Sequence, residues 1–364
     1  MGKTEKDRLI QTLNSHLNTI HDTFQLLNQT PASSLDKVNW DEVVKLGDQV
    51  SKQATIVGML WTGEKPEAKG IEENMETYFN ILQGFLLLSH GSTVGAGPTL
   101  TSSIHASVKQ VVDCSFKLMM ETVPSYGSQN KDLKHVVPQL VGAVWEACSA
   151  LKKTPASNII AIGRAMTQVA VSVKDVLREM KELKPASSNV TKESCDDTSP
   201  NEESNSHGDN NSSDDDLGND LSPEEMKIAQ SAVLVVSEAV IVIKELIRTI
   251  TGLLKQEKPD DTGDFVDSLE KLLKMCQDIG VQIDELGACL YPPQEFPDIK
   301  TALDKISTVI GDMLAVVESF KSCSEPFVQA CNGLRSSIKR MESETDCSCT
   351  TDIEVKLQNV VLSN

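Results

Sequence analysis

Apolar side chains recur every three or four residues along most of the chain, a spacing that places them on one face of an α-helix. In residues 6–28 this stripe is formed by Leu9, Leu13, Leu17, Ile20, Phe24 and Leu27. Similar stripes predict further helices, which end where proline, glycine or polar residues interrupt the pattern. Their expected ranges are about 39–62, 67–89, 99–124, 132–152, 155–183, 223–255, 264–290, 296–321 and 325–343.

Long helices joined by short loops pack antiparallel into bundles, so the pattern predicts an all-α fold. Six of the expected helices precede residue 184 and four follow residue 222. We therefore expect an N-terminal helical bundle over 1–183, a C-terminal helical block over 223–344 and a polar tail over 345–364. The pattern leaves open whether the two blocks are separate bundles or one interwoven body.

The helix expected at 223–255 has the clearest start in the chain. Ser222 is a good N-cap, Pro223 suits the first helical position, and Glu225 completes a capping box. The run at 232–243, AVLVVSEAVIVI, would suit a strand by propensity, but the cap and the length of the pattern favour a helix. The run is too short to span a membrane, and a serine and a glutamate interrupt it, which indicates a buried core helix.

Residues 184–222 contain almost nothing to bury. They carry ten acidic side chains against two lysines, a local charge of −8, among many serines and asparagines. Because burial there does not offset the entropy of ordering, we predict an acidic disordered linker between the two helical blocks. Four serines have an acidic residue three positions later, as acid-directed kinases require: Ser194, Ser199, Ser212 and Ser213. They are candidate phosphorylation sites, although the same composition also serves solubility alone.

The whole chain is strongly acidic, with 53 Asp and Glu against 34 Lys and Arg and a formal net charge of −19. This charge repels phosphate backbones and anionic lipid surfaces, so it disfavours direct binding to nucleic acid or membranes. The N-terminal stretch lacks the unbroken apolar run of a signal peptide, and the nine cysteines show neither disulfide nor zinc spacing. We therefore expect an intracellular protein.

No catalytic motif stands out in the sequence. None of the six histidines lies in an HExxH pattern, no serine lies in GxSxG, and the glycines at 91, 95 and 97 are not followed by the Gly-Lys-Ser/Thr of a phosphate loop. The sequence thus predicts no catalytic residue, no metal site and no cofactor. We expect a helical protein that is not an enzyme and works by binding other proteins.

Three short stretches, taken together, resemble one protein family. The first is 144–148 (VWEAC), followed by a proline at 155 and by 173–176 (VKDV) with Glu-Met at 179–180. The second is the acidic segment followed by a helix that carries 237–239 (SEA). The third is 283–286 (IDEL), which runs into 290–293 (LYPP). In this order and spacing, the chain resembles the cyclin-D-binding (cyclin-D-interacting) protein family from its first helices to about residue 340.

Within these stretches, five residues form the family-like structural motif: Trp145, Cys148, Tyr291, Pro292 and Pro293. A structural role is available for the last three as well. The two prolines terminate a helix, and we expect the tyrosine to pack over its last turn. The resemblance transfers no binding residue position by position.

The resemblance implies an all-helical protein without a catalytic site that binds D-type cyclins and helix-loop-helix transcription regulators. It further implies a negative regulator of cell-cycle progression that occurs in cytoplasm and nucleus. Since the chain has no basic DNA-contacting region, we expect it to sequester helix-loop-helix factors through apolar helix faces.

A second interpretation is a cytoskeletal or adhesion adaptor of the vinculin and talin kind. Those proteins are also built from bundles of long amphipathic helices. Binding to actin filaments or adhesion proteins would indicate an adaptor, and co-purification with cyclins would indicate a regulator.

Overall fold

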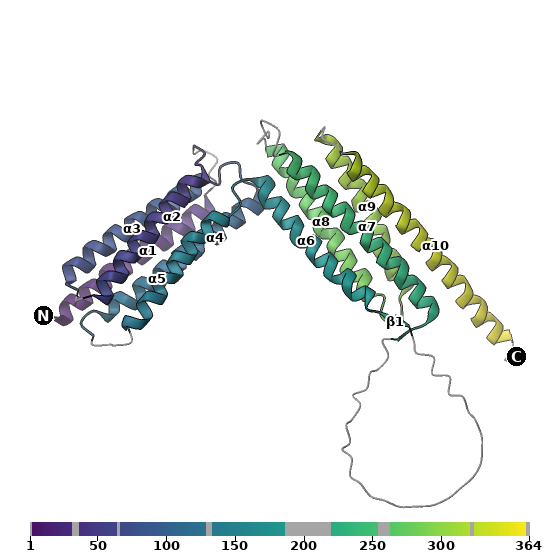
Figure 1. Cartoon of the computed structure of the whole chain (residues 1–364), viewed down its shortest axis with the longest axis horizontal. Helices are drawn as coiled ribbons and strands as arrows, with labels where there is room; N and C mark the ends of the chain where they lie inside the picture. The colour runs from purple at the N-terminus through teal and green to yellow at the C-terminus, as the bar shows by residue number, and fades with distance from the viewer. Residues whose placement is uncertain are drawn as a thin grey trace, which may run out of the picture. The chain divides into compact units, whose positions relative to one another are not determined.

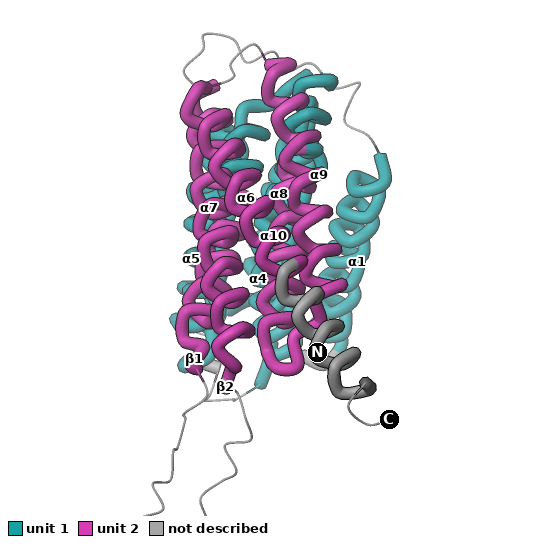
Figure 2. The backbone as a smooth tube through the Cα atoms, turned by 90° about the vertical axis from the view of Figure 1, so that its right-hand side faces the viewer, with its two compact units in different colours: residues 1–164, 256–271 teal, residues 165–255, 272–364 magenta. Residues whose placement is uncertain are grey.

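A computed structural model describes residues 2–30, 36–63, 66–128, 133–185, 220–253, 263–320 and 324–361. Helices account for nearly all the regular structure in these ranges, so the prediction of an all-α fold is confirmed (Figure 1). The chain forms two compact units, and each is described by itself. Unit 1 comprises Met1–Arg164 and Gln256–Lys271, and unit 2 comprises Ala165–Lys255 and Leu272–Asn364 (Figure 2).

Unit 1 is built on long helices that run side by side. They are α1 (Gly2–Gln29), α2 (Trp40–Thr62), α3 (Ala68–Gly91), α4 (Pro98–Thr122) and α5 (Leu133–Ala150), with short 3-10 turns at Val123–Ser125 and Leu151–Lys153. α2 packs along both α3 and α5, α1 packs along α3, and α4 packs along α5. The apolar stripes predicted from the sequence meet in one continuous core between these helices.

The pairing of α2 with α5 is antiparallel, as predicted. Lys152, just after α5, forms an ion pair with Asp48 near the start of α2, with 3.3 Å between the charged atoms. Earlier in α5, Val141 lies against Gly58 near the end of α2, and a Cβ on that glycine would come within 3.0 Å of the valine side chain. Contacts that advance along one helix as they retreat along the other define an antiparallel pair.

Buried polar side chains in this core find partners. The hydroxyl of Tyr78 donates to Ser115 Oγ at 2.9 Å, and the indole N–H of Trp40 donates to the carbonyl of Leu151 at 3.0 Å. Burial raises the pKa of Tyr78, so its hydroxyl stays protonated and available to donate. The first bond joins α3 to α4 and the second joins the start of α2 to the 3-10 turn after α5, and they fix the register of the packing.

The loop before α4 is held by two other helices of the chain. Asn158, the first residue of α6 (Asn158–Lys181), accepts from the backbone N–H of Gly97 at 2.8 Å and donates to the carbonyl of Gly95 at 2.9 Å. Glu270 of α8 (Gly263–Ala288) accepts from the backbone N–H of Thr99 at 2.9 Å and from its hydroxyl at 2.7 Å. Glu270 therefore satisfies an N–H in the first turn of α4 that the helix itself leaves unpaired.

Gly97 is required by this arrangement. A Cβ at residue 97 would lie 2.7 Å from Glu270 Oε1 and 2.7 Å from a methyl of Val266. A larger side chain would displace the carboxylate that caps α4.

The start of α6 differs from the prediction, which placed Pro155 at its first turn. The helix begins at Asn158 because Ser157 acts as its cap. The backbone N–H of Ile160 donates to Ser157 Oγ at 3.4 Å, and Ala161 donates to the Ser157 carbonyl at 3.0 Å. The capping serine, and not the proline, sets the boundary.

Unit 2 contains the rest of α6 and α8 together with α7 (Pro223–Leu253), α9 (Phe296–Ser319) and α10 (Glu325–Val361). α10 packs along α7 and along α9. The predicted capping box of α7 is confirmed, since Glu225 N–H donates to Ser222 Oγ at 3.2 Å and Ser222 N–H donates to the Glu225 carboxylate at 2.9 Å.

By length and composition alone, α7 is the one helix in the described ranges that could cross a membrane. Of its most apolar stretch, 56% is buried inside the protein. The apolar side chains of 232–243 lie mainly in the core of unit 2, among them Ala232, Val235, Val236, Ala239, Val242 and Ile243. The interpretation of this run as a buried core helix is confirmed.

α6 and α8 lie in parallel and approach each other closely. A Cβ on Gly280 would come within 3.1 Å of Val169, and a Cβ on Gly287 would come within 3.0 Å of Val176. Both contacts advance by seven residues along both helices, which is the heptad step of parallel helices. The parallel pairing follows from the up-and-down order of the bundle, because α7 runs back between them in the sequence.

A two-residue parallel pair joins the ends of the segment predicted to be a linker. In β1 (Lys184–Pro185) and β2 (Asp220–Leu221), Lys184 is opposite Asp220 and Pro185 is opposite Leu221 (Figure 1). Leu221 is fully buried, so it fixes this point to unit 2. Residues 186–219 lie outside the described ranges, and the prediction of a disordered linker stays a prediction.

The compact units differ from the predicted domain limits. Unit 1 ends at Arg164, inside α6, and not near residue 183. No composition change marks that point, because a continuous helix crosses it.

α10 continues to Val361, whereas the prediction ended it at 343 and placed a polar tail over 345–364. Residues 345–361 contain neither proline nor glycine, so nothing in them ends a helix.

The Glu270 cap gives a stability prediction for unit 1. Glu270→Ala leaves the N–H and hydroxyl of Thr99 without their acceptor, and we expect the free energy of unfolding to fall by about 1–2 kcal/mol. All three tryptophans lie in unit 1, at positions 40, 61 and 145, so their fluorescence during urea denaturation reports on this unit. Glu76→Ala, at an exposed position of α3, is the matched control, and equal midpoints for the two variants would contradict the assignment.

The buried thiols give a second prediction. Burial raises the pKa of Cys148 and of Cys276 to about 12, so both stay protonated well above neutral pH. Because only the thiolate reacts, a short pulse of N-ethylmaleimide at about pH 8 should leave both unlabelled in the native protein and label both in denaturant. Cys114 and Cys289, which are partly exposed, should react before Cys148 and Cys276. Mass spectrometry of the digested protein measures each site, and rapid native labelling of Cys148 would refute its placement in the core.

Candidate functional site

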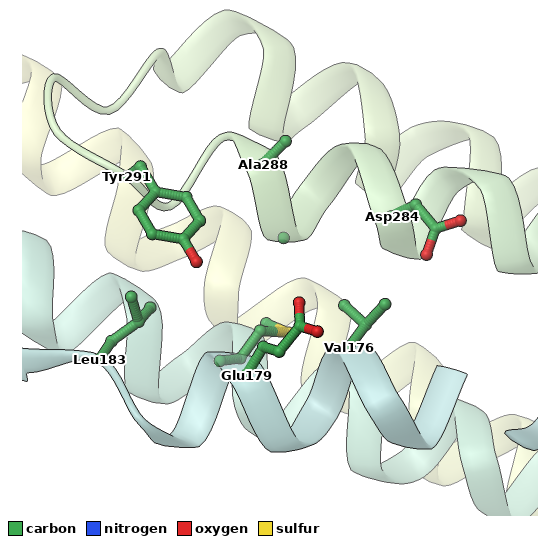
Figure 3. Close-up of a pocket in the computed structure, with 8 residues that line it drawn as sticks. Val176, Glu179, Leu183, Asp284, Ala288 and Tyr291 are labelled. Atoms are coloured by element: carbon green, nitrogen blue, oxygen red, sulfur yellow. The ribbon is translucent and has the colours of Figure 1, made fainter. Parts of the chain in front are cut away.

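Two of the stretches singled out in the sequence come together in unit 2. The α6–α8 groove is a cavity of about 270 Å³ between these two helices, open on one side (Figure 3). Its lining is Val176, Glu179, Met180, Leu183, Asp284, Gly287, Ala288 and Tyr291. The stretches at 173–180 and 283–293 supply most of these residues, although more than a hundred positions separate them.

Helical spacing places the lining residues on facing sides. Val176 and Glu179 on α6, and Leu183 two residues beyond it, follow at steps of three and four, and on α8 Asp284 and Ala288 are four apart. Gly287 lies between the helices and contributes no side chain, so Val176 can approach it closely. The close approach of the helices therefore sets the floor of the groove, and longer side chains form its walls.

Tyr291 closes one end of the groove from the turn that follows α8. In Figure 3 its ring lies opposite Leu183, with the hydroxyl directed toward α6. The side chain remains 44% exposed. Its position differs from the expected packing over the last turn of its own helix, because the chain has already left the helix at Ala288.

The turn that carries Tyr291 is anchored from both sides. Leu290 is fully buried, and the side-chain amide of Gln294 donates to the Leu290 carbonyl at 3.0 Å and to the Glu225 carbonyl at 3.2 Å. Pro292 and Pro293, joined by a cis peptide bond, follow directly. α8 ends four residues before the first of these prolines. The prolines therefore shape the turn and do not themselves end the helix, contrary to the prediction from the sequence.

The groove is chemically suited to binding. Valine, methionine, leucine and alanine supply apolar surface, and Glu179 and Asp284 supply one carboxylate from each helix. No histidine, cysteine or lysine lines the cavity, and its one hydroxyl belongs to Tyr291. Among the residues that the structure describes, no group of three His, Cys, Asp or Glu side chains is arranged to hold a metal ion.

The motif stretch at 144–148 lies in unit 1, and its two singled-out residues differ in burial. Trp145 is 47% exposed, and its indole N–H donates to Thr55 Oγ1 at 3.1 Å and to the Ser51 carbonyl at 3.3 Å. The indole is thereby held against α2, where Ile56 and Met59 are also exposed. Cys148, one turn later, is buried in the core and has a packing role.

In the part of the chain that the structure describes, the histidines are spread over unit 1. The His16 ring stacks on Phe79 with 4.9 Å between ring centroids. His90 and His105 line another cavity of unit 1, and burial lowers the pKa of both, so they are neutral at physiological pH. Ser194, Ser199, Ser212 and Ser213, the candidate phosphorylation sites, lie outside the described residues.

Sequence reasoning missed the pairing of Glu179 with Asp284 across one groove. It quoted both residues within motifs but had no means to bring α6 and α8 together. The exposure of Val281 and Tyr291 is visible only in the structure, so no local sequence signal marked this groove.

Comparison with known proteins gives the relatives of the chain. The family described as Grap2 and cyclin-D-interacting matches with its N-terminal part over residues 42–186 and with its C-terminal part over residues 206–315. Cyclin-D1-binding protein 1 homolog of Xenopus laevis is 20% identical over 287 residues, which cover 79% of this chain and 81% of the relative. Human Cyclin-D1-binding protein 1 is 21% identical over 296 residues, which cover 79% of this chain and 78% of the relative.

The two matched regions together cover well over half of the chain and include both halves of the α6–α8 groove. The chain belongs to the Grap2 and cyclin-D-interacting protein family, as its short motifs predicted.

Proposed function

We propose that this protein is a non-catalytic regulator that binds D-type cyclins and, as a second class of partner, helix-loop-helix transcription regulators. In this role it is a negative regulator of cell-cycle progression that acts in cytoplasm and nucleus. Phosphorylation of the acidic segment at Ser194, Ser199, Ser212 or Ser213 would add negative charge to the protein and modulate binding.

The observation that carries the proposal is the match of both family regions, together with relatives whose names state cyclin D1 binding. The surface of the chain is compatible with such a role. Aromatic side chains are enriched in protein interfaces, and Trp145 on α5 and Tyr291 in the turn after α8 are each about half-exposed. The α6–α8 groove offers surface for a partner and no catalytic group apart from carboxylates and one phenol.

Direct binding tests the proposal. We expect the purified full-length chain to bind purified cyclin D1 in a saturable, stoichiometric manner in a calorimetric titration. An A-type cyclin serves as the control and should bind more weakly. The same purified chain is sedimented with actin filaments, which an adaptor of the vinculin and talin kind would accompany. Actin binding without cyclin binding would contradict the regulatory role and support the adaptor.

A further inference from the structure

We propose that the α6–α8 groove is a docking site for an amphipathic helical segment of a partner protein that carries Lys or Arg beside its apolar stripe. The inference rests on the proposed function in assuming a protein partner, and it adds the face that binds and the chemistry of the segment that binds there.

The shape of the site suits a helix. Residues 281, 284, 288 and 291 follow at steps of three and four, and all four are exposed, so α8 and its following turn present one open stripe. Val281 and Tyr291 are 51% and 44% exposed, so this stripe offers apolar surface that a partner could cover. An amphipathic helix laid into a groove buries apolar surface of this kind, and the cavity of about 270 Å³ accepts its anchoring side chains.

The charge of the site selects the partner. Glu179 and Asp284 face the groove from opposite helices, and in the described part of the chain neither forms an ion pair. Two acidic neighbours do form ion pairs, since Asp175 pairs with Arg178 at 3.1 Å and Glu285 pairs with Lys305 at 3.7 Å. The two carboxylates that line the cavity can therefore attract a basic group from outside.

Two other occupants are disfavoured by charge. One candidate is the chain's own segment 186–219, which follows Leu183 and β1 in the sequence. Residues 184–222 carry a net charge of −8, which two carboxylates repel. A second copy of the chain, with a net charge of −19, is repelled more strongly. With the chain's own acidic segment and a second copy both disfavoured, a basic segment of a partner protein is the occupant that the charge favours.

The test uses the full-length chain and a fluorescein-labelled peptide of about 18 residues that forms an amphipathic helix with a leucine stripe flanked by lysines. Fluorescence anisotropy measures binding. We expect the double substitution Glu179→Gln and Asp284→Asn to weaken binding about tenfold. Ala288→Trp, which fills the groove from an exposed position, should abolish it.

The matched control removes the same charge elsewhere in unit 2. Asp312→Asn with Glu318→Gln changes two exposed acids of α9 that do not line the groove, and it should leave the affinity nearly unchanged. A peptide with glutamates in place of lysines should not bind. Circular dichroism confirms that each variant is folded.

Equal weakening by both double substitutions would overturn the proposal, since only the overall charge would then attract the peptide. Unaltered binding to Ala288→Trp would also overturn it. Cyclin D1 binding, measured on the same unsubstituted chain, separates the two claims. Cyclin binding without any peptide binding removes the docking site alone, and peptide binding without cyclin binding removes the proposed function alone.

Discussion

The close approach of α6 and α8 is the constraint on which the groove depends. Gly280 and Gly287 have no side chains where Val169 and Val176 press against α8. Packed interiors leave few voids, so any larger residue at these glycines would move the helices apart. The facing of Glu179 and Asp284, and the reach of Tyr291 toward α6, both follow from this spacing.

Within unit 1, α6 and α8 each contact the loop before α4, α6 through its first residue and α8 through its eighth. Asn158 and Glu270 bind that loop through four hydrogen bonds to the residues between Gly95 and Thr99. α6 and α8 are thus positioned at their beginnings by polar contacts and along their later turns by apolar ones. Polar contacts of defined geometry specify register, whereas apolar packing supplies most of the stabilisation.

Much of the fold could be predicted from the sequence, because helix formation leaves local signals. The stripe of apolar residues predicted the helices within a few positions, and Ser222 with Glu225 predicted the start of α7 to the residue. Errors arose where a competing local signal prevailed, as Ser157 did over Pro155, or where no signal exists, as at the unit boundary inside α6. The groove could not be predicted from the sequence, because Gly287 and Val176 are far apart along the chain and no local pattern indicates their contact.

The β1–β2 pair has a consequence for the evolution of this chain. Lys184 and Asp220 are held opposite each other, so the segment between them leaves and returns at one point of unit 2. The entropy of closing a flexible loop changes by only about 0.6 kcal/mol for each doubling of its length. A change in the number of residues between β1 and β2 therefore adds little to the cost of closing this loop, so the interval can gain or lose sequence while the helices on either side stay in place.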